Sequence, residues 1–323
     1  MYESLRSHCT QQYPDYEIVF GVNAQDDPAV ESVKALQREF PDRPIRLVTC
    51  DRVTGSNRKI SNLAELEKAA RHEVFLVNDS DILVPPDYLS TVVAELDAPD
   101  IGLVTCLYYA VPGGGIWSRL ESLGISTDFM PGVLVARELE HGLHFGLGST
   151  LAFRKSDLQR IGGFEAIADF LADDYQLGTR IASLGLKVEL SRTVVETFLP
   201  HYDNSSFISH QLRWARTIRS SRPGGYAGLP LTFTFFWALI TLMASRVSPW
   251  AIGVFTIALV LRLAVAVLSA RLVLRDRSFF RSAWLLPIRD LLAPLIWVAG
   301  LVGNRIVWRG QVFRLNRGKL YPA

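Results

Sequence analysis

The chain has 323 residues, with 34 lysines and arginines against 32 aspartates and glutamates, and 49% of its residues are hydrophobic. This composition excludes a disordered chain, and because the excess positive charge lies in the most apolar part of the sequence, it argues against a nucleic-acid-binding protein with a basic face. Three scattered cysteines without a CxxC pair argue against a disulfide framework and a structural zinc site. The N-terminal residues contain no apolar run, so we predict no cleaved signal peptide.

Short apolar runs alternate with longer amphipathic stretches through the first two-thirds of the chain. Runs rich in Val, Ile and Leu predict strands, and apolar residues at helical spacing predict helices. The predicted strands are 16–22, 45–50, 73–79 and 101–109, and the predicted helices are 28–40, 60–72, 86–96, 154–162 and 173–185. This alternation predicts an α/β fold with a mostly parallel, Rossmann-like sheet.

The character of the chain changes after residue 222, where 12 basic residues accompany only two acidic ones among mostly apolar sequence. We therefore expect a soluble domain at 1–222 and a membrane-associated helical region at 223–323. The segments 229–245 and 247–270 approach the length of about 20 residues that a spanning helix needs, and they are predicted to form a hairpin. A third segment, 287–304, is shorter and is either a tilted span or an interfacial helix. The alternative, buried helices of a soluble domain, is less favoured.

Arginines flank the predicted hairpin on both sides. Because basic residues favour the cytoplasmic side of a membrane, both flanks and the acidic domain are predicted to be cytoplasmic. The preceding cations are Arg213, Arg216, Arg219 and Arg222, and the following ones are Arg271, Arg275, Arg277 and Arg281.

Two carboxylates, Asp79 and Asp81, lie at the carboxyl end of the predicted strand 73–79 in the stretch EVFLVNDSDILV. Ligands of open α/β sheets bind at the carboxyl ends of the strands, and residues two apart on an extended chain point to one side. Oxygen ligands of this kind suit Mg²⁺ or Mn²⁺, which can bridge a nucleotide diphosphate. The pattern therefore predicts a metal site, against the simpler interpretation of an Asp-rich turn.

Two further motifs stand closer to the apolar region. Asp173 and Asp174 begin a predicted helix, where they either interact with the helix dipole or take part in chemistry. In HQLRWARTIR, Arg213 has the geometry to bind a pyrophosphate and Trp214 to pack beside it. The same stretch also fits an interfacial helix whose arginines meet lipid headgroups, and both interpretations can hold together.

In order and spacing, NDSDI, RKSDLQRIGGF, ADDYQLGTRIASLG and HQLRWAR resemble an inverting GT-A glycosyltransferase of the ceramide glucosyltransferase family, including its bacterial hopanoid-biosynthesis relatives. The resemblance implies a catalytic Asp, a DxD-type acid, and a (Q/R)xxRW signature. It places catalysis on Asp174, the metal on Asp79 and Asp81, and the nucleotide on Asp27, Lys59, Asn62, Asp79, His210, Arg213 and Trp214.

The sequence departs from the family pattern in two places. His210 occupies the first position of the signature, where the family has Gln or Arg. Members of the family usually begin with a membrane helix and a strand that contacts the uracil ring, and we expect this sequence to start after both.

The resemblance implies transfer of glucose or N-acetylglucosamine from a UDP-sugar to a lipid hydroxyl, with inversion, at a bacterial inner membrane. A composition of 28 arginines and six lysines is typical of a GC-rich bacterium and favours a hopanoid over ceramide as the acceptor. Two alternatives remain open: a polyprenyl-phosphate sugar transferase with the same fold, and a non-catalytic membrane scaffold.

Overall fold

The computed structural model describes residues 1–323, which form two compact units. The first unit contains residues 1–108, 135–198 and 319–321, and the second contains 109–134, 199–318 and 322–323. The units therefore do not divide at residue 222. Residues 199–222 group with the apolar C-terminal helices instead, because helix α9 (Asn204–Ser221) packs on helix α14 (Leu286–Leu301).

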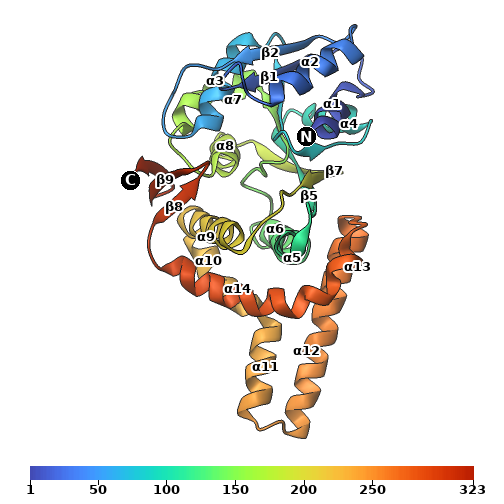
Figure 1. Cartoon of the computed structure of the whole chain (residues 1–323), viewed down its shortest axis with the longest axis vertical. Coiled ribbons are helices and arrows are strands. Elements are labelled where there is room, and N and C mark those ends of the chain that lie inside the picture. The colour runs from blue at the N-terminus through green and yellow to red at the C-terminus, as the bar shows by residue number, and fades with distance from the viewer. The chain divides into compact units, whose positions relative to one another are not determined.

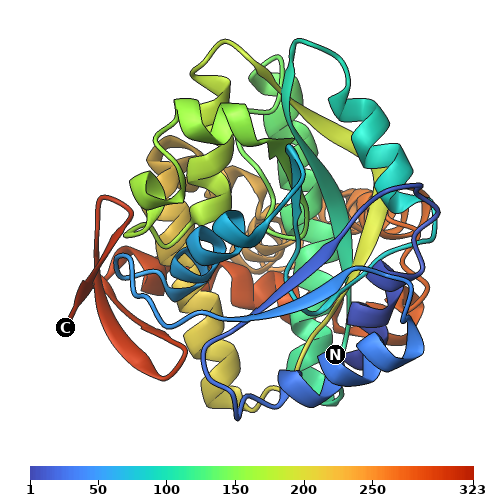
Figure 2. The ribbon, with the colours of Figure 1, turned by 90° about the horizontal axis from the view of Figure 1, so that it is seen from above.

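The first unit opens with helix α1 (Tyr2–Cys9) and a strand–helix–strand segment. Strands β1 (Ile18–Val22) and β2 (Ile45–Thr49) pair in parallel, with helix α2 (Ala29–Glu39) between them in the chain. Figure 2 shows the two strands, in blue, lying side by side. Helix α3 (Arg58–Ala69) follows β2 and contacts β1. The parallel pair and both longer helices confirm the sequence predictions for this segment.

A five-stranded sheet forms the centre of this unit, in the order β3-β6-β5-β7-β4. Its β3–β6, β5–β6 and β4–β7 pairs are antiparallel, so the fold is a mixed α/β arrangement. The strands are β3 (Val74–Val77), β4 (Ile82–Leu83), β5 (Ile101–Val111), β6 (Leu151–Arg154) and β7 (Lys187–Phe198). Strand β5 is apolar along nearly its whole length because it is buried on both faces.

Four short helical segments cover this sheet. They are α4 (Tyr88–Leu96), α7 (Lys155–Arg160), the 3₁₀ turn η2 (Phe164–Ile167) and α8 (Asp173–Ala182). A hydrophobic cluster joins α4 to the strands through fully buried side chains such as Tyr88 and Val92. The predicted helices at 86–96, 154–162 and 173–185 are thus confirmed, each with ends shifted by a few residues.

The second unit is mainly helical. Helix α5 (Gly115–Gly124) continues through a π-helical turn, η1 (Ile125–Phe129), into α6 (Met130–Leu139). After α9 come α10 (Pro223–Gly228), the 3₁₀ turn η3 (Leu229–Thr232), α11 (Thr234–Ala244) and α12 (Pro249–Val267), which ends in the π-helical turn η4 (Leu268–Val273). Helix α13 (Phe279–Ser282) and the turn η5 (Ala283–Leu285) lead into α14.

Two continuous helical stretches are long and apolar enough to cross a membrane, Pro249–Val273 with 25 residues and Phe279–Leu301 with 23. The first predicted segment, 229–245, contains the 3₁₀ turn η3 and the 11-residue helix α11. Helix α11 reaches a spanning length only together with Pro223–Thr232, from which it is bent by 47°. Eleven residues of α-helix extend about 16 Å, roughly half of a hydrocarbon core. Helices α11 and α12 form the predicted hairpin, and α14 runs across its base (Figure 1).

Two arginines of α9 donate hydrogen bonds to backbone carbonyls at the C-terminal end of α14. The Arg219 guanidinium donates to the carbonyls of Gly300 and Leu301, each at 2.6 Å, and to that of Gly303 at 2.9 Å, while Arg216 donates to Val302 at 3.0 Å. These carbonyls end a helix, where cations are favoured by the helix dipole. Two of the four arginines that precede the hairpin therefore serve as a helix cap.

The chain ends in short strands. Strands β8 (Arg305–Trp308) and β9 (Gln311–Asn316) form an antiparallel hairpin in the second unit. In the last strand, β10 (Lys319–Pro322), Lys319 makes a bridge with Phe170, and its ammonium lies 5.3 Å from the centre of that ring. The C-terminal residues thus contact the loop that precedes α8.

Candidate functional site

The turn after β3 presents Asp79. The neighbouring Asn78 holds the turn in place, because its amide nitrogen donates to the Ser149 carbonyl at 2.6 Å and to the Tyr88 hydroxyl at 2.8 Å. Tyr88 is buried, and its hydroxyl also forms a hydrogen bond with the Thr150 hydroxyl. The Asp79 side chain keeps 46% of its surface exposed. A carboxylate is therefore presented on a rigid turn at the carboxyl end of a strand, as the sequence predicts.

The Asp81 side chain is hydrogen-bonded to strand β7. Its Oδ2 accepts a hydrogen bond from the Thr197 hydroxyl at 3.1 Å. Burial, with the Asp79 carboxylate adding to it, raises the pKa of Asp81 above its usual range. The two carboxylates of the DxD pattern are thus close enough to repel each other, and Asp81 is the more deeply placed of the two.

Lys59 links the turn after β3 to helix α8. Its Nζ lies 2.7 Å from Asp79 Oδ1 and 3.3 Å from Asp173 Oδ2. Asn57 sets the position of Lys59, because its side chain caps α3 by accepting from the Lys59 and Ile60 amides. Burial alone would lower the pKa of Lys59, but Asp173 and Asp79 together hold it well above its ordinary value. The ammonium is therefore a permanent cation inside the site.

Asp174 lies in the first turn of α8, where its Oδ1 accepts from the Tyr175 amide at 2.7 Å. Burial, followed by repulsion from Asp173, raises the pKa of Asp174 to about 6, while the Lys59 ammonium and this hydrogen bond oppose the rise. A carboxylate with a pKa near working pH is suited to accept a proton in catalysis. These electrostatics match the role that the resemblance gives to Asp174.

Two glycines shape the surroundings of Asp174, one on helix α8 and one in the loop that contains Gly146 and Gly148. A Cβ on Gly178 of α8 would lie 2.2 Å from the Gly146 nitrogen, so only glycine allows the helix to approach so closely. A Cβ on Gly148 would lie 3.3 Å from Asp174 Oδ2 and 3.6 Å from Asp79 Oδ2. The bare backbone of Gly148 therefore leaves open space between the two carboxylates.

The remaining nucleotide candidates of the first unit differ in placement. Asn62 lies on α3 one turn after Lys59, and its Oδ1 is buried without a hydrogen-bond partner. Buried polar atoms are normally hydrogen-bonded, so this oxygen is a candidate for binding a ligand. Asp27 instead accepts a hydrogen bond at 2.9 Å from the amide of Ala29, the first residue of helix α2. No interaction in the structure joins Asp27 to the other carboxylates, and its role in nucleotide binding stays a prediction.

The signature residues lie together on α9 in the second unit. His210 stacks on Tyr202 with ring centres 5.4 Å apart, and Trp214 packs against His210 at 5.6 Å and against Phe129 at 5.1 Å. Burial lowers the pKa of Arg213 from its ordinary value. The structure thus gathers His210, Arg213 and Trp214 on one helix, among aromatic rings.

The sequence analysis assigns no role to Asn57. Its side-chain amide donates to the Phe170 carbonyl at 2.7 Å and to Asp173 Oδ1 at 3.4 Å, 116 positions away. A helix-capping Asn two residues before the Lys was the one local signal for this network.

No three His, Cys, Asp or Glu side chains form a group that could hold a metal ion by themselves. Mg²⁺ commonly uses only one or two carboxylates and completes its shell with substrate phosphates and waters. Asp79 and Asp81 match this smaller requirement in number, with the Lys59 ammonium beside Asp79 Oδ1 and the Thr197 hydroxyl donating to Asp81 Oδ2.

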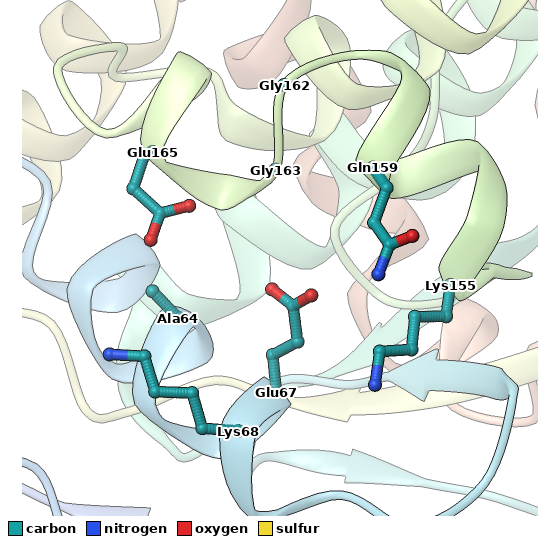
Figure 3. A pocket seen from close by; sticks show the side chains of 8 residues that line it. All are labelled: Ala64, Glu67, Lys68, Lys155, Gln159, Gly162, Gly163 and Glu165. Carbon is teal, nitrogen blue, oxygen red and sulfur yellow. The ribbon is translucent and has the colours of Figure 1, made fainter.

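A surface hollow of about 420 Å³ lies elsewhere on the first unit, between α3 and the α7–η2 turn. Figure 3 shows Glu67 of α3 and Glu165 of η2 directed toward it, with Lys155 and Gln159 of α7 on its other side. Burial, helped by Glu165, raises the pKa of Glu67. None of the predicted site residues lines this hollow.

Comparison with known proteins gives consistent results. The model of glycosyl transferase family 21 matches residues 1–321. Ceramide glucosyltransferase 3 of Caenorhabditis elegans is 27% identical over 327 residues, covering 98% of this chain and 70% of that protein. Ceramide glucosyltransferase 1 of the same organism is 25% identical over 357 residues, covering 98% and 69%.

Among solved structures, a mannosyltransferase from Pyrobaculum calidifontis in complex with GDP-Man and Mn²⁺ is similar. The TM-score is 0.56 at 21% identity, over 93% of this chain and 81% of that one. This similarity confirms the GT-A fold class.

Proposed function

The chain belongs to glycosyl transferase family 21 and is a glycosyltransferase, and we propose that it transfers a sugar from a UDP-sugar to a lipid hydroxyl with inversion. UDP-glucose and UDP-N-acetylglucosamine are the proposed donors, and a hopanoid or ceramide is the proposed acceptor. The observation that carries the proposal is the cluster of Asp79, Lys59, Asp173 and Asp174 at the strand ends of a GT-A fold.

Asp174 is proposed as the general base. Its carboxylate takes the proton of the acceptor hydroxyl while the hydroxyl oxygen attacks the anomeric carbon. The bond from that carbon to the diphosphate breaks, and its electron pair leaves with UDP. One displacement of this kind inverts the anomeric configuration. A base with a pKa of about 6 is ionised at neutral pH, yet still accepts a proton readily.

Asp79 and Asp81 are proposed to hold Mg²⁺ or Mn²⁺, which supplies positive charge to the departing diphosphate. Lys59 lies beside Asp79 and provides a second cation, and the unpartnered Asn62 Oδ1 is free to accept from the nucleotide. For the second unit, Arg213, with His210 and Trp214, is proposed as a diphosphate-binding group.

The proposal that the acceptor is a lipid is based on the apolar surface of the C-terminal helices. Side chains of α12 such as Ile257 and Val260 are 61% and 58% exposed, and an apolar surface of this extent is suited to a bilayer. The proposed location is a bacterial inner membrane, with the catalytic domain in the cytoplasm as the flanking arginines indicate.

The test uses the full chain purified in detergent with added lipid. Radiolabelled UDP-glucose and UDP-N-acetylglucosamine are supplied with each candidate lipid and Mn²⁺, and the product is identified by mass spectrometry and by the NMR coupling of its anomeric proton. The proposal expects a neutral glycolipid of inverted configuration. A sugar linked through a phosphodiester would show a polyprenyl-phosphate acceptor instead, and failure to bind UDP would favour a scaffold.

The metal assignment is tested separately with Asp79→Ala. Calorimetry with UDP and Mn²⁺ is expected to show weaker metal-dependent binding for this variant. Asp100→Ala is the matched control, because Asp100 pairs with Lys187 at 2.8 Å on the exposed surface. Equal affinity of Asp79→Ala and the control would contradict the metal role.

A further inference from the structure

Helix α14 and the turn η5 before it carry a stripe of exposed apolar side chains. The members of the stripe are 39% to 64% exposed and follow one another at intervals of three or four residues, which places them on one face of the helix. They are Trp284, Ile288, Leu291, Leu295 and Val298. An uncovered apolar face of this length indicates a contact surface.

The opposite face of α14 is covered by protein and carries the charges of the helix. Arg289 lies 3.3 Å from Asp128 of η1, and Asp290 lies 2.7 Å from Arg262 of α12. If the stretch Phe279–Leu301 crossed a bilayer, this ion group would lie near the middle of the hydrocarbon core, where charges are costly. The two faces instead suit a helix with protein on one side and lipid on the other.

Helix α14 lies transverse to the α11–α12 hairpin, as Figure 1 shows. Helices α11 and α12 pack side by side, with the rings of Phe235 and Phe255 centred 5.7 Å apart, and α14 contacts α11 at the base of the hairpin. Since the hairpin and α14 run in different directions, a bilayer that the hairpin enters along its length has α14 along its surface.

Arg262 marks the level at which α12 passes α14. Its guanidinium contacts Asp290 of α14 and Asp128 of η1, so the ion group and α14 lie at one depth. Residues 249–261 of α12 lie on the hairpin side of Arg262 and extend about 20 Å. Charged groups are least costly at the edge of the hydrocarbon core, and this level therefore fits the membrane surface.

Both ends of α14 have the chemistry of a membrane surface. Trp284 begins the stripe, and tryptophan is enriched where the bilayer meets water. Arg277 and Arg281 are exposed nearby in the chain, and arginines of this kind pair with lipid phosphates. At the other end, Arg219 and Arg216 satisfy the carbonyls of residues 300–303, as backbone groups away from water require.

We infer that α14 lies in the plane of the membrane surface, with its stripe in contact with the acyl chains of one leaflet, and that only α11 and α12 of the C-terminal helices enter the hydrocarbon core. The stripe adjoins the hairpin, because α14 contacts α11, so the lipid that surrounds the hairpin also covers the stripe. The inference rests on the membrane location of the hairpin and not on the proposed donor or acceptor.

The first experiment measures the depth of the stripe. Single cysteines at its five positions are spin-labelled in the full chain, in nanodiscs of phosphatidylcholine and phosphatidylglycerol; the native cysteines are buried and do not react. Collision rates with oxygen, which enters lipid, and with a water-soluble nickel chelate give the depth of each label. We expect one shared depth just inside the acyl region, whereas a spanning helix separates positions 284 and 298 by about 21 Å.

Three results would overturn the inference. They are a steady change of depth along the stripe, which shows a span; access to the nickel chelate at all five positions, which shows water; and protection from both reagents, which shows a protein partner. Labels at Val254 and Leu261 of α12 are the control, since both side chains are exposed and are expected to differ in depth by about 10 Å. Water access at both would reject the membrane location as well.

The second experiment compares the two sides of the membrane. Arg277→Cys precedes α14 and Gln311→Cys follows it, and both positions are exposed. A membrane-impermeant maleimide is added to intact bacterial cells and to inverted membrane vesicles, with permeabilised cells showing that each cysteine reacts. We expect both cysteines to react at least tenfold faster from the same side. Reaction from opposite sides would show that α14 crosses the bilayer and would overturn the inference, whatever the transferase activity.

Discussion

The ammonium of Lys59 lies 2.7 Å from Oδ1 of Asp79, joining the first turn of α3 to the turn after β3. The same ammonium reaches Asp173 at 3.3 Å, beside the Asp174 carboxylate. Because Lys59 lowers the pKa of Asp174, it adjusts the proposed base as well as neutralising the acids that surround it.

Replacing Lys59 by Met is therefore expected to shift the pH dependence of sugar transfer. Without the ammonium, the pKa of Asp174 rises above its value of about 6, so a higher pH is needed to ionise the base. The acid limb of the pH–rate profile is expected to move upward. A radiolabelled transfer assay between pH 5 and 9 measures it.

Lys187→Met provides the control for this change, because Lys187 pairs with Asp100 on the exposed surface. Its acid limb should match that of the wild type. An unshifted limb in Lys59→Met would show that the ammonium does not act on the catalytic base.

Asp174→Asn is expected to lower the transfer rate by about 10² to 10⁴-fold, the usual contribution of a general base. The amide keeps the size of the side chain but cannot accept the hydroxyl proton. UDP affinity, measured by calorimetry, is expected to stay within about twofold of wild type, since the residue is not proposed to hold the nucleotide. Wild-type turnover in this variant would exclude the role.

The same residue gives a test of stability against pH. The folded-state pKa of Asp174 is raised, so the native state binds more protons than the unfolded chain between about pH 4 and 6. Its contribution to stability therefore falls as pH rises through that window. Asp174→Asn is expected to melt at a higher temperature than the wild type above pH 6, and a lower melting temperature there would contradict this electrostatic account.

Gly148→Ala is expected to damage the site without damaging the fold. The added methyl group would lie 3.3 Å from Asp174 Oδ2 and 3.6 Å from Asp79 Oδ2, in the space between the proposed base and the proposed metal ligand. UDP binding and transfer should both fall at least tenfold while the melting temperature stays close to wild type. Calorimetry and a thermal melt check this.

Gly132→Ala is the control for the added methyl group. Gly132 lies within α6, and a Cβ there meets nothing within 4 Å. Both its activity and its stability should equal or exceed the wild-type values. Full activity of Gly148→Ala would show that donor and acceptor do not use that space.

Arg262 is the charged residue of α12, and its guanidinium contacts Asp290 at 2.7 Å and Asp128 at 2.8 Å. Arg262→Met is expected to destabilise the second unit by about 3 kcal/mol, because it leaves the largely buried Asp290 carboxylate without its cation, whereas Asp128 keeps Arg289 at 3.3 Å. Thermal melts in detergent measure the loss. The double variant Arg262→Met with Asp290→Leu should recover part of it, and a double variant no more stable than Arg262→Met would contradict the pairing.

Much of the fold follows from neighbouring residues. Apolar runs define β2 and β5, and spacing along the chain defines α2 and α4, because strands and helices bury their faces with periods that are read locally. The order of the acidic and HxxRW motifs indicated the family, which the match over residues 1–321 confirms. The positions of the membrane helices were less well defined, since apolar content alone does not show that α11 is short and bent away from the helix before it.

By itself, the amino-acid sequence determined the strand and helix alternation, the family and the identity of the acidic residues, since each depends on side chains close together in the chain. Only the tertiary structure decided that Lys59 bridges two carboxylates, and that the Glu121 carboxylate lies 3.3 Å from Nδ1 of His210. Contacts between distant segments depend on how helices and strands pack against one another, and that packing has no signature in any short stretch of residues.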